Sequence, residues 1–141
     1  MRVVSFAPSL SAVPLDSGGV VAEGFPMTSC YVDRFPAQVQ IPIVVAVVTS
    51  GGGDYNPRKF IVATAPNGER VGALQFAWQW PDNPPVPVKF RVFAQQFPMT
   101  VPSSGVYTLG LFDSLEETES EHLFPLPVLR RNPLTSSAAR N

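Results

Sequence analysis

The residues that could carry catalytic or metal chemistry are few in this chain. It has one histidine, His122, and one cysteine, Cys30, in 141 residues. A structural zinc site needs about four cysteine or histidine ligands, so the composition argues against zinc. A serine hydrolase would need His122 as its base, but the chain has no Gly-x-Ser-x-Gly motif. We therefore predict a surface histidine beside Glu121, no cofactor and no enzymatic activity.

Five carboxylates gather between Asp113 and Glu121. They lack the Asp-x-Asp-x-Asp-Gly spacing of a calcium-binding loop. Ser114 and Glu117 have capping-box spacing, which leaves one or two helical turns as an alternative. The segment has no apolar stripe, however, so we predict an irregular acidic connection. Cys30 lies in a predicted strand, where an inert, buried thiol is the commoner outcome.

The elements that must position these residues are strands. The 16 prolines are scattered from Pro8 to Pro133, and proline inside a helix costs about 3 kcal/mol. The remaining segments are short, rich in valine and phenylalanine, and bounded by turn residues. The length suits one domain. We predict an all-β fold, a single β-sandwich of about seven to nine strands over residues 1–129, with a polar C-terminal tail over residues 130–141.

Hydrophobic patterning places the individual strands. The run from Ile41 to Val48 predicts a central strand buried on both faces, and Asn67-Gly68 predicts a tight hairpin turn. The alternation of Leu74, Phe76, Trp78 and Trp80 puts four large side chains on the core side of one strand. The predicted strands are Arg2–Phe6, Val20–Glu23, Met27–Val32, Gln38–Thr49, Lys59–Ala65, Val71–Trp80, Val86–Phe97, Gly105–Phe112 and Leu123–Leu129. The predicted core contains Val45, Val47, Val62, Phe76, Trp78, Tyr107, Leu109, Leu111, Leu126 and Val128.

The stretch Pro102–Phe112 is similar to the penultimate-strand signature of immunoglobulin-like sandwiches. In those domains the hydroxyl of a tyrosine, here Tyr107, binds backbone across a corner. The whole chain also resembles a family of small bacterial and phage-borne all-β proteins of unknown function. The motifs that carry this resemblance are Pro42-Ile43-Val44-Val45, Pro66-Asn67-Gly68 and Phe124-Pro125-Leu126-Pro127-Val128. The resemblance implies an immunoglobulin-like fold and carries over no site residue.

Charge and hydropathy restrict the partners. The formal net charge is −1, whereas a protein that binds duplex DNA needs a basic face. No apolar run is long enough for a membrane span, and the N-terminal segment lacks the apolar core of a signal peptide. A single cysteine favours a reducing compartment. We predict a cytoplasmic protein, or a virion protein if the chain is phage-derived.

Binding is the function class that these exclusions leave. Trp80 and the rigid turn with Pro84 and Pro85 could anchor a partner at the rim of the sandwich. Three arginines of the tail could contact an acidic partner or a neighbouring subunit: Arg130, Arg131 and Arg140. We predict a non-catalytic interaction module that acts on a protein partner or on itself as a homo-oligomer. The alternatives are a structural subunit of an assembly such as a phage particle and a β-sandwich that binds a small ligand.

Overall fold

The computed structural model describes residues 1–50, 56–80 and 87–132. The described residues form ten strands and no helix. The strands are β1 (Arg2–Pro8), β2 (Ser11–Pro14), β3 (Val20–Glu23), β4 (Cys30–Val32), β5 (Ala37–Ser50), β6 (Arg58–Thr64), β7 (Arg70–Ala77), β8 (Val88–Val101), β9 (Gly105–Phe112) and β10 (Leu123–Arg130).

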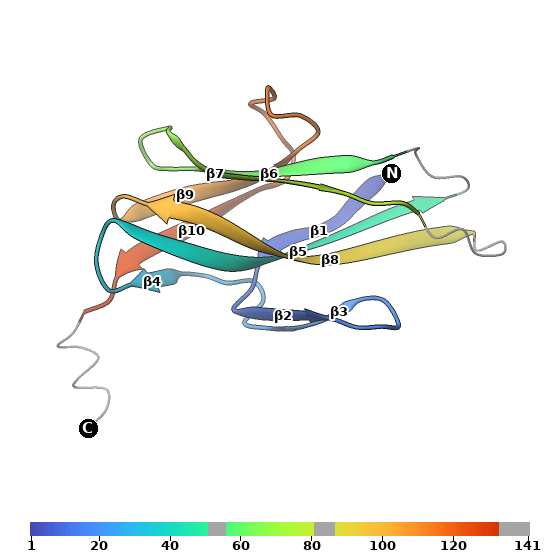
Figure 1. Cartoon of the computed structure of the whole chain (residues 1–141), viewed down its shortest axis with the longest axis horizontal. Helices are drawn as coiled ribbons and strands as arrows, with labels where there is room; N and C mark the ends of the chain where they lie inside the picture. Colours follow the sequence, from blue (N-terminus) through green and yellow to red (C-terminus); the bar gives the residue numbers. More distant parts are fainter. Residues whose placement is uncertain (51–55, 81–86, 133–141) are drawn as a thin grey trace.

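Two sheets pack face to face and form the predicted all-β sandwich (Figure 1). The first sheet has the strand order β1-β5-β8, and the second has the order β4-β10-β9-β6-β7. A separate two-stranded hairpin, β2-β3, lies on the side of β5 and β8 that faces away from the second sheet. The eight strands of the two sheets agree with the predicted number, and the hairpin adds a third layer.

Strand β5 is the centre of the first sheet. It pairs with β1 on one side and with β8 along its whole length of 14 residues on the other. Ile43, Val45 and Val47 point into the core, and Val44 and Val48 are buried on the opposite face. The prediction of a strand buried on both faces is therefore confirmed.

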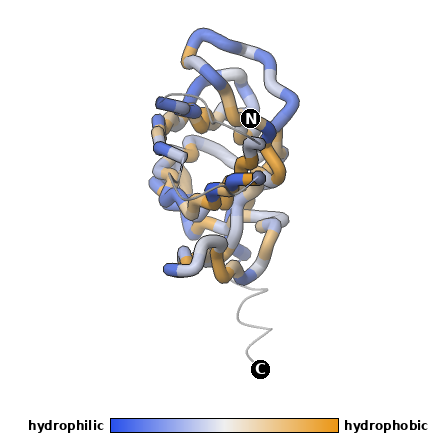
Figure 2. Tube along the Cα trace, turned by 90° about the vertical axis from the view of Figure 1, so that its right-hand side faces the viewer, coloured by the Kyte–Doolittle hydropathy of each residue, from blue (hydrophilic) through white to orange (hydrophobic). Residues whose placement is uncertain are grey.

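The core lies between the two sheets, which surround it in the view along the strands (Figure 2). All ten residues predicted for the core are buried. Leu74 and Trp80 are half-buried and pack against the same cluster. The predicted alternation, with four large side chains on the core side, is therefore confirmed.

Tyr107 forms the corner that the Gly-Val-Tyr sequence predicts. Its ring is fully buried, and its hydroxyl donates to the carbonyl oxygen of Ser103 at 2.6 Å. Gly105 begins β9 at φ +144°, and a Cβ atom at this position would lie 2.6 Å from Pro66. The β8–β9 corner therefore packs directly against the β6–β7 turn.

Strand β10 carries two prolines along an edge that is largely free. The N–H of Leu111 donates to the carbonyl of His122 at 3.0 Å, so alternate residues from 122 onward point their backbone groups toward β9. Pro125 and Pro127 therefore face the other side, where β4 covers only residues 128–130. Neither proline has an N–H, so this edge offers few donors to another strand.

Some strand boundaries differ from the prediction. Residues 27–29 are not in a strand, and β4 begins only at Cys30, because Pro127 of β10 has no N–H to donate to them. The hairpin strand Ser11–Pro14 was missed, since it is short and ends in proline. Strand β7 ends at Ala77 rather than Trp80, and β8 continues to Val101 rather than ending at Phe97. The connection from 113 to 122 is irregular, as predicted.

Replacing Tyr107 by phenylalanine should remove the corner hydrogen bond and keep the buried ring. We expect the Tyr107→Phe protein to lose about 0.5–1.5 kcal/mol of unfolding free energy, because one net hydrogen bond is removed. Urea denaturation measures this loss. Tyr31→Phe is the control, because Tyr31 is more than half exposed, and it should change stability by less than about 0.5 kcal/mol. Equal effects of the two variants would contradict the role of the corner.

Candidate functional site

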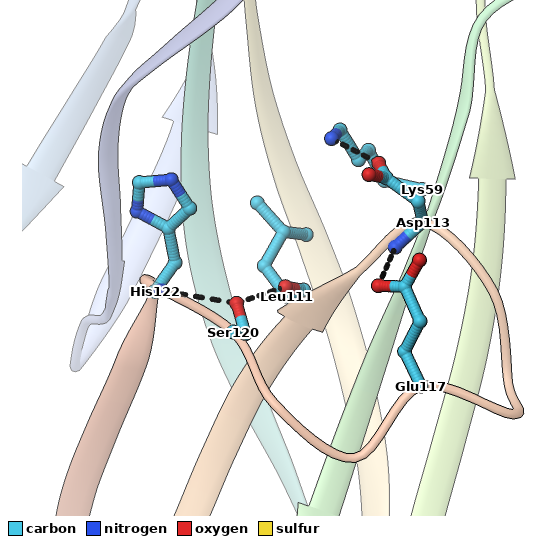
Figure 3. A network of polar contacts seen from close by, with 6 residues as sticks. All are labelled: Lys59, Leu111, Asp113, Glu117, Ser120 and His122. Carbon is cyan, nitrogen blue, oxygen red and sulfur yellow. Dashed lines mark hydrogen bonds and ion pairs between the residues drawn. The ribbon is translucent and has the colours of Figure 1, made fainter.

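The connection between β9 and β10 stands above the second sheet and is the most hydrophilic projection of the molecule (Figures 1 and 2). Three polar contacts fix its course, and Figure 3 shows the first two. Asp113 forms an ion pair with Lys59 of β6, and the N–H of Asp113 donates to Glu117 Oε2 at 3.3 Å. The guanidinium of Arg70 donates to the carbonyl of Leu115 at 2.8 Å. Two of the predicted acidic residues thus have structural partners.

Ser120 holds the other end of this connection. Its hydroxyl donates to the carbonyl of Leu111 at 2.5 Å and accepts from the N–H of His122 at 3.0 Å (Figure 3). These bonds go to backbone groups rather than to the imidazole ring. The serine and the histidine are close in space, but this arrangement does not make the hydroxyl a nucleophile activated by a base.

A cleft of about 770 Å³ lies between this connection and the N-terminal strand. Its lining mixes both signs of charge: Met1, Arg2, Val3, Lys59, Leu111, Asp113, Glu117, Glu119, Ser120, Glu121 and His122. Within residues 1–50, 56–80 and 87–132, no three carboxylate, histidine or cysteine groups converge as metal ligands would. The cleft is an open polar surface, and the Ser120 hydroxyl and two of its carboxylates, Asp113 and Glu117, already make internal contacts.

Trp78 and Trp80 form an aromatic cluster with two core phenylalanines. The Trp78 ring lies 5.8 Å from Phe76, 5.1 Å from Phe93 and 5.8 Å from Trp80, measured between centroids. Trp78 is 5 % exposed and Trp80 is half-buried. Both indole Nε1 atoms are buried without an acceptor in the described part of the chain. Trp80, a predicted partner contact, therefore gives most of its surface to the core.

The other predicted contact residues are dispersed. Arg130 is the exposed last residue of β10. Arg131 donates its N–H to the carbonyl of Val32 at 2.7 Å, and its guanidinium binds Asp33 at 3.1 Å. Both groups thus tie the end of β10 to β4. Pro84, Pro85 and Arg140 lie outside the described residues, so no common site with Trp80 is described.

Cys30 begins β4 and is half-buried. Burial raises the pKa of its thiol above the ordinary value of 9.0. A raised pKa lowers the fraction of reactive thiolate at neutral pH. This agrees with the predicted unreactive cysteine.

The surface that sequence analysis missed is the β2-β3 hairpin. Val13 and Val21 lie directly opposite one another across its two strands and are 61 % and 54 % exposed. Ala12 and Ala22, on the other side, are half-buried where the hairpin packs on β5 and β8. The exposed apolar residues of this segment, which we call the hairpin surface, are Leu10, Val13, Leu15, Val21 and Phe25.

A groove extends this surface toward β8. It has a volume of about 620 Å³ and lies between the hairpin turn and residues 90–92. Leu15 lines one wall and Phe90, more than half exposed, lines the other. Leu15 and Phe90 therefore extend the apolar surface onto the sandwich, and Asp16 and Arg91 line the same groove. The sequence signal for this surface was the presence of valine at two outward positions, Val13 and Val21, beside Ser11 and Glu23 at the other two.

The base of the hairpin is held by buried hydrogen bonds. Ser9 is fully buried, and its hydroxyl lies 2.8 Å from the carbonyl oxygen of Ser11 and 2.7 Å from that of Glu23. The N–H of Met27 donates to the carbonyl of Pro8 at 2.7 Å. The hairpin is thus fixed before any partner binds, which lowers the entropy lost on binding.

Removing the Ser9 hydroxyl should loosen the hairpin. We expect amides of β2 and β3 to exchange with deuterium about fivefold faster in Ser9→Ala, since one net hydrogen bond is worth about 1 kcal/mol. Ser11→Ala is the matched control, because Ser11 is exposed, and it should leave exchange unchanged. Identical exchange in both variants would show that Ser9 does not hold the hairpin.

The raised pKa of Cys30 predicts slow alkylation. The rate with iodoacetamide should rise with pH and reach half its maximum above pH 9.0, the ordinary thiol pKa, because only the thiolate reacts. The same chain unfolded in urea should show a lower midpoint. Equal midpoints in the folded and unfolded chain would contradict burial as the cause.

No family model, curated protein or solved structure matches the chain. The resemblance to small bacterial and phage-borne proteins therefore remains a prediction. No helix in the part of the chain that the structure describes has the length and apolar character needed to cross a membrane.

Proposed function

We propose that the protein is a non-catalytic interaction module that binds a protein partner through the hairpin surface. One observation carries the proposal: Val13 and Val21, opposite each other at the centre of the hairpin, are both more than half exposed. A solvated face of an antiparallel ribbon normally presents polar side chains. Contiguous exposed apolar groups mark contact surfaces on soluble proteins.

The hairpin surface suits a protein partner better than the polar cleft does. The centres of protein interfaces are depleted of charge and enriched in apolar and aromatic groups. The segment from Leu10 to Phe25 has only two charges, Asp16 and Glu23. The groove beside it adds Phe90, an aromatic side chain of the type that anchors partners.

A non-catalytic role is supported by the state of the polar groups in the cleft. The Ser120 hydroxyl is engaged with two backbone groups. The Asp113 carboxylate is paired with Lys59, and Glu117 accepts from the Asp113 N–H. A catalytic acid, base or nucleophile must instead be free to face a substrate.

We also infer that the sandwich is immunoglobulin-like. The supporting features are the order β10-β9-β6-β7 in one sheet and the position of β8 beside β5 in the other. The tyrosine corner between β8 and β9 also supports this inference, because immunoglobulin domains have a tyrosine corner at the turn before the penultimate strand. Such domains are frequent scaffolds for binding, which agrees with the proposed function only by analogy.

Capture from cells that naturally produce the protein tests this function. Tagged wild-type protein and two variants, Val21→Lys and Val106→Lys, are cross-linked in the cell and recovered. Val106 is the matched control, because it is 53 % exposed and lies on β9. We expect bound protein to be recovered at least about tenfold less with Val21→Lys, because a buried charge is costly at an apolar contact, and equally with Val106→Lys. Equal recovery with wild type and Val21→Lys would refute the proposal.

A further inference from the structure

We propose that the partner of the hairpin surface is the same surface of a second copy of this chain, an inference that rests on the proposed function. The hairpin carries apolar side chains on both sides, and Ser11 and Glu23 share the outward side with Val13 and Val21. Ala12 and Ala22 face the sandwich, whereas Val13 and Val21 face outward. Neighbouring exposed apolar side chains mark a surface that a partner covers, and the sandwich covers only the inward side of the hairpin.

The geometry of the hairpin fits a copy of itself. Val13 and Val21 form one cross-strand pair in the middle of the ribbon. A two-fold axis close to this pair places the same two valines of a second copy on top of it, as an isologous contact requires. Sheets stack face to face at about 10 Å, so one ribbon can cover the outward side chains of another.

The charges of the surface are also compatible with self-association. Asp16 lies in the turn at one end of the ribbon, and Glu23 lies at the other end. No charge occupies the centre that could repel an identical centre or select a basic or acidic partner. The net charge of −1 adds little repulsion between two whole molecules.

The exposed area matches the requirement of a weak dimer. Six large apolar side chains, each 45–64 % exposed, belong to the hairpin surface and the adjoining groove wall. Together they offer at most roughly 500 Å² per copy, taking about 150 Å² for each side chain, the lower end of the aromatic range. Two copies would bury about 1,000 Å², the lower limit for specific interfaces. We therefore expect dissociation in the micromolar range. The six are Leu10, Val13, Leu15, Val21, Phe25 and Phe90.

Light scattering after size exclusion tests the dimer on the full chain. The wild-type mass should rise from 15.3 kDa toward twice that value as the concentration increases from about 1 to 500 µM. Val21→Lys should stay monomeric throughout, and Val106→Lys should dimerise like the wild type. A wild-type monomer at the highest concentration, a dimer that survives Val21→Lys, or a dimer lost in Val106→Lys overturns the proposal.

Cross-linking gives a second readout that does not depend on a disruptive variant. Under oxidation, Val21→Cys should form a disulfide between copies, whereas Val106→Cys should not, with Cys30 present in both. Circular dichroism checks that each variant is folded. Failure of Val21→Cys to cross-link, or equal cross-linking of both variants, counts against the dimer.

The two proposals can fail separately. Suppose that the wild type is monomeric and captures a different protein from the cell, and that Val21→Lys does not capture it. The hairpin surface then binds a foreign partner, and the dimer is refuted. If Val21→Lys changes neither the mass nor the captured protein, the proposed function fails together with the dimer.

Discussion

The pairing of β5 with β8 is the interaction on which the remaining structure depends. The two strands pair over 14 residues each, and both contribute large apolar side chains to the core. The opposite face of the same pair supports the hairpin through Ala12 and Ala22. A strand buried on both faces thus serves two layers at once, which is why its sequence is an unbroken apolar run.

This arrangement gives the molecule two ends of different chemistry. The connection from β9 to β10 is hydrophilic. Some of its polar side chains make internal hydrogen bonds, and one forms an ion pair. The hairpin is apolar, and buried Ser9 fixes its base. Carboxylates in water cost nothing to leave exposed, whereas exposed valines do. Covering the hairpin would therefore gain free energy, whereas covering the hydrophilic connection would not.

The sequence was most informative where residue type alone decides the structure. Strands β3 and β9 have the predicted bounds, and the alternation along β7 identified the aromatic core because two-residue periodicity needs no knowledge of distant contacts. The hairpin surface could not be predicted, because β2 has only four residues and ends in proline. The outward direction of Val13 is set by how Ala12 packs on β5 and β8, a tertiary contact that local patterning does not contain. Arg131 is a similar case, because its partner Asp33 is distant in sequence.

The prolines of β10 have a consequence for the architecture of any assembly that this chain builds. An edge that lacks donors at Pro125 and Pro127 is a poor template for another strand. Continuous hydrogen-bonded ribbons, in which each subunit extends the sheet of the previous one, are therefore disfavoured along this edge. Contacts through side-chain faces with a two-fold axis close on themselves. Growth by this route ends at a fixed number of subunits instead of continuing as a fibre.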